Sequence, residues 1–237
     1  MTPLPLHIVM PVLNEAEGVT ATLQALQPLL ARGAQLVVVD GGSEDGTPDQ
    51  VRAMAAQQPG VHGIAAPRGR ALQMNAGARW LRDNIGAGTL LFLHADTTLP
   101  PEADKRIAHA LADGQQRVWG RFDVRIIGRH WMLPVIACCM NWRSRLSGIA
   151  TGDQAIFITH AAFDAVGGLP PQPLMEDIEL SARLKRLSRP ACLHARVSTS
   201  GRRWETRGVW RTMALMWRLR LAYWRGMAPE RLAALYR

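Results

Sequence analysis

Three short apolar runs in the first half of this chain are each followed by a carboxylate. The runs and the acidic residues after them are 6–12 with Glu15, 35–39 with Asp40, and 89–93 with Asp96. Continuous apolar runs of this length are typical of strands that helices cover on both faces. The pattern therefore predicts buried strands whose ends carry acidic side chains.

Segments with helical periodicity alternate with these strands. They cover residues 15–30, 49–57, 71–82 and 101–112, and a weaker strand is expected at 61–65. This order indicates βαβ units and an α/β fold with a mostly parallel central sheet flanked by helices. Right-handed crossovers place the carboxyl ends of such strands at one edge. A polar crevice is expected there, suited to a nucleotide, a divalent metal and a general base.

The alternation weakens after residue 115. A strand over 118–127 is a candidate for antiparallel pairing. The other elements expected after it are a helical segment over 131–146, a strand over 155–159, a helix over 176–187, a strand over 192–197 and a long helix over 209–224. No linker separates the two halves, so residues 1–200 are expected to form one domain. Residues 201–237 are expected to form a basic helical segment packed on it.

Composition limits the class of protein. Of the 237 residues 48% are hydrophobic, which is too apolar for a disordered chain. No apolar run reaches the ~18 residues of a membrane-spanning helix, and the N-terminus lacks the pattern of a secretory signal. Three cysteines without a metal-binding spacing favour reduced, mostly buried thiols. We therefore expect a cytoplasmic protein, with contact to the inner face of the membrane as an option.

Positive charge gathers at the C-terminus. The net charge is +9, and residues 202–237 hold nine arginines against two glutamates. Trp210, Trp217 and Trp224 repeat every seven residues beside a stripe of arginines, which makes this helix amphipathic. The helix could sit at an anionic membrane surface. The interpretation we favour is that its tryptophans pack on the protein's own core or on a second copy.

An acidic turn and a basic loop are candidate sites of ligand contact. Asp40 ends a buried strand before two glycines, so its carboxylate could accept hydrogen bonds from a base or a ribose. It could equally cap the turn. Arg68 and Arg70 flank Gly69 just before a helix, a place that favours anionic groups and polar base edges. The plainer alternative is a pair of solvated arginines.

Glu176 and Asp177 open the helix over 176–187. Asp177 lies on the same side as Leu180 and Leu184, so it can point inward, and the helix N-terminus favours its ionised form. An ionised carboxylate can take a proton from a hydroxyl group. Both acids could instead only stabilise the helix start.

Asp153 and Gln154 lie at the mouth of a short apolar strand. Their polar side chains could bind hydroxyl groups of an acceptor or of a donor sugar. They could equally close their own loop by hydrogen bonding.

Several motifs together resemble those of glycosyltransferase family 2. They are PVLNE at 11–15, VVDGGSEDGT at 38–47, HAD at 94–96 and the pair Glu176-Asp177. The resemblance covers most of residues 6–190. A closer likeness, to the compact subfamily described as associated with arsenosugar biosynthesis, is carried by RGRALQMNAGA, LLFLHADT, GRFDVRI, GDQAIF and PLMEDIEL.

The resemblance implies a GT-A fold and a metal-dependent, inverting transfer of a sugar from a nucleotide diphosphate. Asp177 would be the catalytic base. Nucleotide contacts would come from Pro11, Glu15, Asp40, Arg70 and Asp96. Two positions depart from the family pattern: Gly41 stands where a second Asp is usual, and His94 where the first Asp of DxD is usual. Asp96 alone would then be the main protein ligand of Mg²⁺ or Mn²⁺.

The stretch GRRW at 201–204 is distantly similar to the QxxRW motif of processive sugar polymerases in the same broad family. The likeness implies that Arg202 or Arg203 clamps the diphosphate and that Trp204 stacks on a sugar or an acceptor. With Asp153, Gln154 and Glu176, Arg203 and Trp204 complete the expected acceptor or donor-sugar contacts.

The leading interpretation is thus a glycosyltransferase with a small-molecule or lipid-linked hydroxyl acceptor. A nucleotidyltransferase on a similar sheet and a basic nucleic-acid-binding protein are the alternatives. The first usually carries a Gly-rich basic loop after its first strand, where this chain has LNEAEG, and the second lacks a recognition motif here. The leading interpretation requires Asp40, Asp96 and Asp177 to converge on one pocket.

Overall fold

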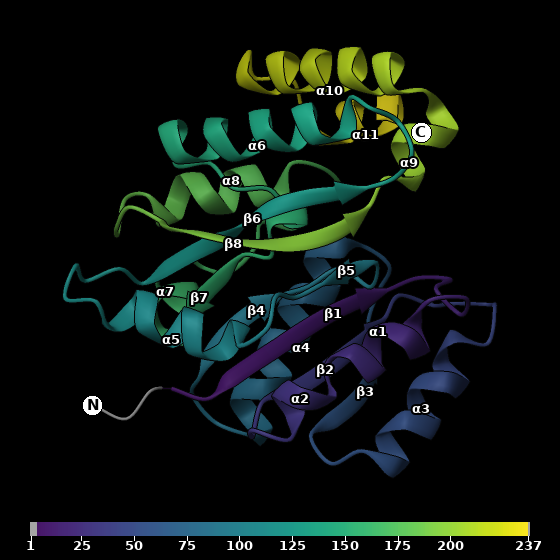
Figure 1. Cartoon of the computed structure of the whole chain (residues 1–237), viewed down its shortest axis with the longest axis vertical. Helices are drawn as coiled ribbons and strands as arrows, with labels where there is room; N and C mark the ends of the chain where they lie inside the picture. Colours follow the sequence, from purple (N-terminus) through teal and green to yellow (C-terminus); the bar gives the residue numbers. More distant parts are fainter. Residues whose placement is uncertain (1–3, 237) are drawn as a thin grey trace.

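The computed structural model describes residues 4–236 and contains one mixed sheet with helices on both faces (Figure 1). The spatial order of its strands is β3-β2-β1-β4-β7-β6-β8-β5. The strands are β1 (Leu6–Val12), β2 (Gln35–Asp40), β3 (Val61–Ala65), β4 (Thr89–Phe92), β5 (Thr97–Thr98), β6 (Trp119–Ile127), β7 (Phe157–Thr159) and β8 (Ala191–Ser200).

The first four long strands are parallel, as the sequence predicts. Their apolar residues alternate between two separate cores because successive side chains of a strand point to opposite faces. Ile8 and Met10 of β1 join one core, whereas Val9 joins the other. This double burial explains why these strands read as unbroken apolar runs.

Helices cover each face of the sheet. Residues of α1 (Val19–Ala25), α2 (Gln27–Leu30), α3 (Thr47–Gln57), α5 (Ala103–Ala112) and α6 (Leu133–Ser147) belong to the first core. Residues of α4 (Arg70–Asn84), α7 (His160–Ala165) and α8 (Glu176–Leu184) belong to the second. The expected α/β layering is therefore confirmed.

The second half of the chain extends the same sheet in mixed directions. β7 runs antiparallel to both β4 and β6, whereas β6 is parallel to β8. The strand expected over 118–127 therefore has one antiparallel neighbour, but it points the same way as β1. A buried polar network ties β6 to α6: Arg121 pairs with Asp123 and donates to Ser144 at 3.0 Å, and Asp123 also pairs with Arg145 at 2.7 Å.

Two local expectations were wrong, and two short helices were missed. The helix expected over 15–30 is divided into α1 and α2, because residues 14–16 are bound to the loop after β2 and Pro28 starts a new turn. Cys138 and Cys139 are exposed rather than buried. The short α9 (Arg202–Arg207) and the final α11 (Pro229–Tyr236) were not foreseen.

The C-terminal helices form a small core of their own with the start of α8. Leu219 of α10 (Val209–Trp224) and Leu232 of α11 bury against Met175. The three repeated tryptophans of α10 do not join it: Trp210, Trp217 and Trp224 are 60%, 76% and 83% exposed. The expectation that this stripe packs on the protein's own core is therefore wrong for the described chain, and the other option, packing on a second copy, stays a prediction. No helix within residues 4–236 is long and apolar enough to cross a membrane.

Gly77 shows how closely α4 approaches the sheet. A Cβ at this position would lie 2.6 Å from a methyl of Val9 and 2.9 Å from one of Val39. Both are β-branched side chains within packed strands and have little room to move. Glycine at position 77 therefore lets α4 pack this closely against the sheet.

We predict that Gly77→Ala lowers the free energy of unfolding by about 1–3 kcal/mol, the usual cost of overpacking a core. The comparison is Gly18→Ala, because a Cβ at Gly18 would meet nothing within 4 Å. Urea unfolding measures both. Equal midpoints for the two variants would contradict the packing account.

Candidate active site

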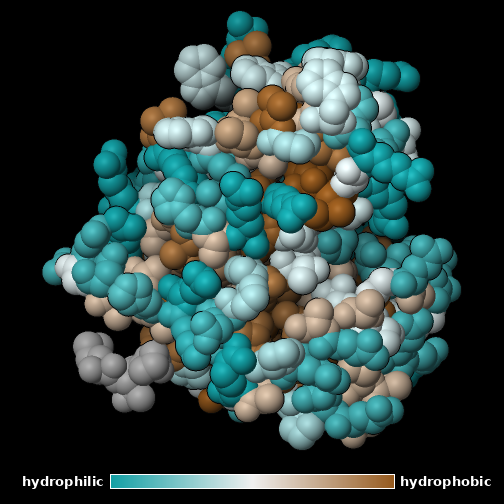
Figure 2. All heavy atoms as spheres, viewed as in Figure 1, coloured by the Kyte–Doolittle hydropathy of each residue, from teal (hydrophilic) through white to brown (hydrophobic). Residues whose placement is uncertain are grey.

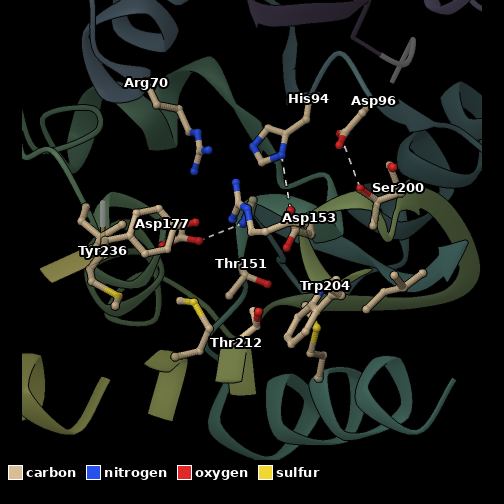
Figure 3. Close-up of a pocket in the computed structure, with 18 of the residues that line it drawn as sticks. Arg70, His94, Asp96, Thr151, Asp153, Asp177, Ser200, Trp204, Thr212 and Tyr236 are labelled. Atoms are coloured by element: carbon tan, nitrogen blue, oxygen red, sulfur yellow. Dashed lines mark hydrogen bonds and ion pairs between the residues drawn. The ribbon is translucent and has the colours of Figure 1, made fainter. Parts of the chain in front are cut away.

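A cavity of about 1310 Å³ opens at the carboxyl ends of β1 and β4 (Figure 3). Its walls come from loops after these strands, the start of α4, the 3₁₀ turn 152–154, the start of α8, and helices α6, α9 and α10. Of the residues predicted to form the site, those that line it are Pro11, Glu15, Arg70, Asp96, Asp153, Glu176, Asp177, Arg203 and Trp204. Segments more than 190 positions apart thus meet in one place, which we call the central cavity.

Asp177 is held by two backbone donors. Gly152 N–H donates to its Oδ2 at 2.9 Å, and Ile178 N–H donates to its Oδ1 at 2.8 Å. Desolvation in the cavity and the adjacent charge of Glu176 raise the pKa of Asp177 to about 6. The carboxylate is therefore fixed in orientation and more basic than an ordinary aspartate.

Arg70 is the cation that balances these acids. Its Nη1 lies 3.4 Å from Oε1 of Glu176, which is almost fully buried. Desolvation lowers the pKa of Arg70, but the carboxylates of Glu176, Asp153 and Asp177 outweigh it and raise the pKa above the ordinary value. The guanidinium stays charged, and it is 43% exposed toward the cavity. It can therefore also meet an anionic ligand.

His94 and Asp153 form a second pair across the cavity. Nδ1 of His94 lies 3.4 Å from Oδ1 of Asp153, and the opposite side of the ring packs against Gly152 (Figure 3). Burial alone would raise the pKa of Asp153, but His94, Arg70 and Arg203 hold it below its ordinary value. His94 therefore orients an ionised Asp153.

Asp96 is exposed and lines the cavity from the loop after β4. Thr97 and Thr199 are the hydroxyl neighbours of its Oδ1, at 3.3 and 3.5 Å. Within residues 4–236 it makes no ion pair with Arg, Lys or His. The pKa of Glu15 is raised, chiefly because its carboxylate is desolvated. The charge of Arg202 opposes this shift, and the charge of Asp96 adds to it.

These side chains fit a divalent metal bound chiefly by its ligand. No three His, Cys, Asp or Glu side chains of the described chain gather closely enough to hold an ion by themselves. One accessible carboxylate, Asp96, suits Mg²⁺ or Mn²⁺ when a diphosphate and water supply the other oxygens. His94 is turned away to Asp153.

Asp40 lies outside the lining of the central cavity. Its Oδ2 accepts from Gly42 N–H at 2.9 Å and from Ser43 N–H at 3.0 Å, and its Oδ1 accepts from the Ser43 hydroxyl at 2.5 Å. In the described chain this carboxylate caps its own turn. Asp96 and Asp177 line the same cavity, and Asp40 does not join them.

Gln154 is also outside the lining, and its side chain closes the 3₁₀ turn. Its Oε1 accepts from Thr151 N–H at 3.2 Å, and its Nε2 lies 3.3 Å from Asn141 Oδ1. Arg203, in contrast, faces the cavity and lies over the ring of Tyr236 at 5.4 Å. Trp204 lines the cavity and packs partly against the main core.

Some important residues were not singled out from the sequence. Gln73 donates to the carbonyls of Val12 and Val39 at 2.9 and 2.8 Å, so it ties the ends of β1 and β2 to the start of α4. A polar residue on the buried face of a helix was its only signal. Arg143 and Arg220 line the cavity from α6 and α10. Both looked like ordinary surface arginines in the sequence.

Comparison with known sequences agrees with this geometry. Residues 7–164 match the family described as glycosyl transferase family 2. The succinoglycan biosynthesis protein ExoA of Rhizobium meliloti is 36% identical over 192 residues, which cover 75% of this chain. The chain spans 57% of that relative's length.

Solved structures show the same fold at low identity. The mannosyltransferase PcManGT of Pyrobaculum calidifontis, solved with GDP-Man and Mn²⁺, has a TM-score of 0.66 at 19% identity over 100% of this chain and 70% of its own. TarS of S. aureus, solved with UDP, has a TM-score of 0.64 at 16% identity over 83% and 60%. The fold is GT-A, and the chain belongs to glycosyltransferase family 2.

Proposed function

We propose that this enzyme moves a sugar from a nucleotide diphosphate to a hydroxyl acceptor in one inverting step. The observation that carries the proposal is the Asp177 carboxylate, held in the same cavity as the exposed Asp96. A hydrolysis screen of nucleotide sugars with divalent metal tests it and identifies the donor. The further likeness to the arsenosugar-associated subfamily rests on sequence motifs and stays a prediction.

Asp177 is the proposed general base. Its two backbone hydrogen bonds fix the carboxylate, and its raised pKa of about 6 leaves it mostly ionised at neutral pH yet basic enough to accept a proton. The acceptor oxygen attacks the anomeric carbon, its proton passes to Asp177, and the bond to the diphosphate oxygen breaks. The electron pair of that bond leaves with the nucleoside diphosphate.

The donor is proposed to lie along the strand-end side of the cavity. Pro11 and Glu15 border the nucleotide, and Arg70 offers a cation beside the acids of α8. Asp153 and Glu176 are placed to accept hydrogen bonds from sugar hydroxyls, and Arg203 to contact the diphosphate. Asp40 and Gln154 would reach a ligand only if their turns rearranged, and their predicted roles rest on sequence alone.

A divalent ion at Asp96 would neutralise the charge that builds on the departing diphosphate. Mn²⁺ accompanies the sugar nucleotide in the mannosyltransferase structure described above. In this chain the fit rests on one exposed carboxylate, that of Asp96, in the lining of the cavity. The donor screen, run with Mg²⁺ and with Mn²⁺, tests which ion the enzyme uses.

We expect Asp177→Asn to lower the rate of transfer about 10²–10⁴-fold, the usual contribution of a general base, while the nucleoside diphosphate still binds. The control is Glu179→Gln, because Glu179 lies on the same helix outside the cavity. Initial rates and calorimetric titration give the two readouts. An Asp177→Asn enzyme as active as the control would contradict the assignment.

The pH profile gives an independent readout. Because the pKa of Asp177 is raised to about 6, kcat/KM should fall as pH decreases through 6, since the protonated form cannot accept a proton. Glu176→Gln removes a negative neighbour and should shift this limb to lower pH. A limb near 4 in the unmodified enzyme, unmoved by Glu176→Gln, would argue against Asp177 as the base.

Metal dependence is tested by binding. Mn²⁺ should strengthen the binding of UDP or GDP, and Asp96→Asn should remove most of that gain, because the ion loses its protein carboxylate. Asp113→Asn, an exposed loop carboxylate outside the cavity, is the matched control. Calorimetry with and without Mn²⁺ measures the difference. An unchanged gain in Asp96→Asn would place the ion elsewhere.

A further inference from the structure

The outer part of the central cavity is an apolar groove between α6 and α10. Its hydrophobic lining residues on these two helices are Val135, Ile136, Cys139, Met140, Trp142, Met213, Met216, Trp217, Leu221 and Trp224. Figure 2 shows hydrophobic side chains at the surface in the upper part of the molecule, where these helices lie. The groove is continuous with the space in front of Asp177.

Several apolar side chains that line the groove are exposed to solvent. Trp217 and Trp224 are 76% and 83% exposed, and Trp142 on the facing helix is 62% exposed. Contiguous apolar surface of this kind marks a binding site, because water contact with it is unfavourable. Methionines beside the tryptophans allow the groove to adapt to a flexible chain.

Polar groups without partners lie within this apolar lining. Nε and Nη2 of Arg143, Nε of Arg220 and Oγ1 of Thr212 are buried and have no hydrogen-bond partner among residues 4–236. Thr212 is only 4% exposed, and its hydroxyl points into the cavity (Figure 3). Buried donors normally find partners, so these three side chains point to a missing acceptor.

An anion with several oxygens would supply the acceptors that these donors lack. Arg143 comes from α6, and Thr212 and Arg220 come from α10, so donors approach from both sides of the groove. Desolvation lowers the pKa of Arg143, and the nearby charge of Asp177 favours its charged form. Two guanidinium groups and a hydroxyl suit a phosphate, which accepts several charge-assisted hydrogen bonds.

We propose that the acceptor is an amphiphile with a hydrocarbon chain, a phosphate and a hydroxyl-bearing headgroup. The chain lies in the α6–α10 groove, the phosphate binds Arg143, Arg220 and Thr212, and the hydroxyl reaches Asp177. The proposal rests on the glycosyl transfer proposed above and narrows its acceptor to the lipid-linked class. The hydroxyl proton goes to Asp177, and the new glycosidic bond replaces the bond to the nucleoside diphosphate.

The position of the arginines separates an acceptor site from a bilayer contact. Arg211 and Arg218 of α10, and Arg225 just after it, are exposed and lie outside the cavity lining, whereas Arg220 lines the cavity. A membrane surface would meet the outward arginines and Trp210. A single lipid phosphate held in the groove meets Arg220 and Trp217 instead.

The first test is binding of dodecyl phosphate below its micelle concentration, followed by tryptophan fluorescence. Butyl phosphate should bind at least about 100-fold more weakly, because each buried methylene adds severalfold to affinity. Dodecanol should also bind more weakly, since it lacks the anion. Equal binding of dodecyl and butyl phosphate would overturn the chain site, and equal binding of dodecanol would overturn the phosphate site.

Matched variants locate the binding. Arg143→Gln and Arg220→Gln should each weaken dodecyl phosphate about tenfold or more, as expected for lost charge-assisted hydrogen bonds, while Arg218→Gln should not. Trp217→Ser should weaken it, while Trp210→Ser should not. Binding of a nucleoside diphosphate by the same samples reports that each variant is folded. If Arg218→Gln weakened binding as much as Arg143→Gln and Arg220→Gln, or Trp210→Ser as much as Trp217→Ser, the contact would be a general surface contact. Either result would overturn the proposal.

The same variants separate this site from the donor site. If the two arginines bind the acceptor, their loss raises the KM for a lipid-phosphate acceptor and leaves donor binding unchanged; a loss of donor binding in both would overturn the proposal. Asp177→Asn should bind dodecyl phosphate normally. A fully active Asp177→Asn enzyme with arginine-dependent binding intact would reject the proposed base while retaining the groove site.

Discussion

The arrangement of charge around Arg70 is the constraint on which the site depends. Three carboxylates, of Asp153, Glu176 and Asp177, raise the pKa of this one guanidinium. Without a cation there, carboxylates packed at the start of α8 would repel one another and favour their neutral forms. Gly152 completes the arrangement, because its N–H binds Asp177 while its missing side chain leaves room for His94. The fold therefore holds two different carboxylates within a single cavity: Asp177, whose pKa is raised, and Asp153, whose pKa is lowered.

The central cavity has two chemically distinct sides. Strand ends and the start of α4 supply Asp96 and Arg70 on one side, while α6 and α10 supply Met, Trp and half-buried arginines on the other. The first side suits a hydrophilic sugar nucleotide, and the second suits a molecule with an apolar part. Asp177 lies where the two meet. A transferase needs this juxtaposition, since its base must touch the acceptor while the donor lies alongside.

The parallel strands could be predicted because burial on both faces leaves a continuous apolar run, as in 6–12 and 35–39. The position of Asp177 followed from helical spacing beside Leu180 and Leu184. Asp40 could not be placed in advance, because a carboxylate after a strand serves its own turn as readily as a ligand. The α6–α10 groove could not be predicted either, because it depends on tertiary contacts that leave Trp217 and Trp224 exposed.

The anomeric configuration of the product tests the central claim most directly. With a donor found by the screen, proton NMR of the first product formed reports whether the new glycosidic bond is inverted relative to the donor. A single displacement assisted by Asp177 predicts inversion. A product that retains the donor configuration from the first turnover would contradict the account, because it requires a mechanism in which Asp177 is not the base for a direct attack.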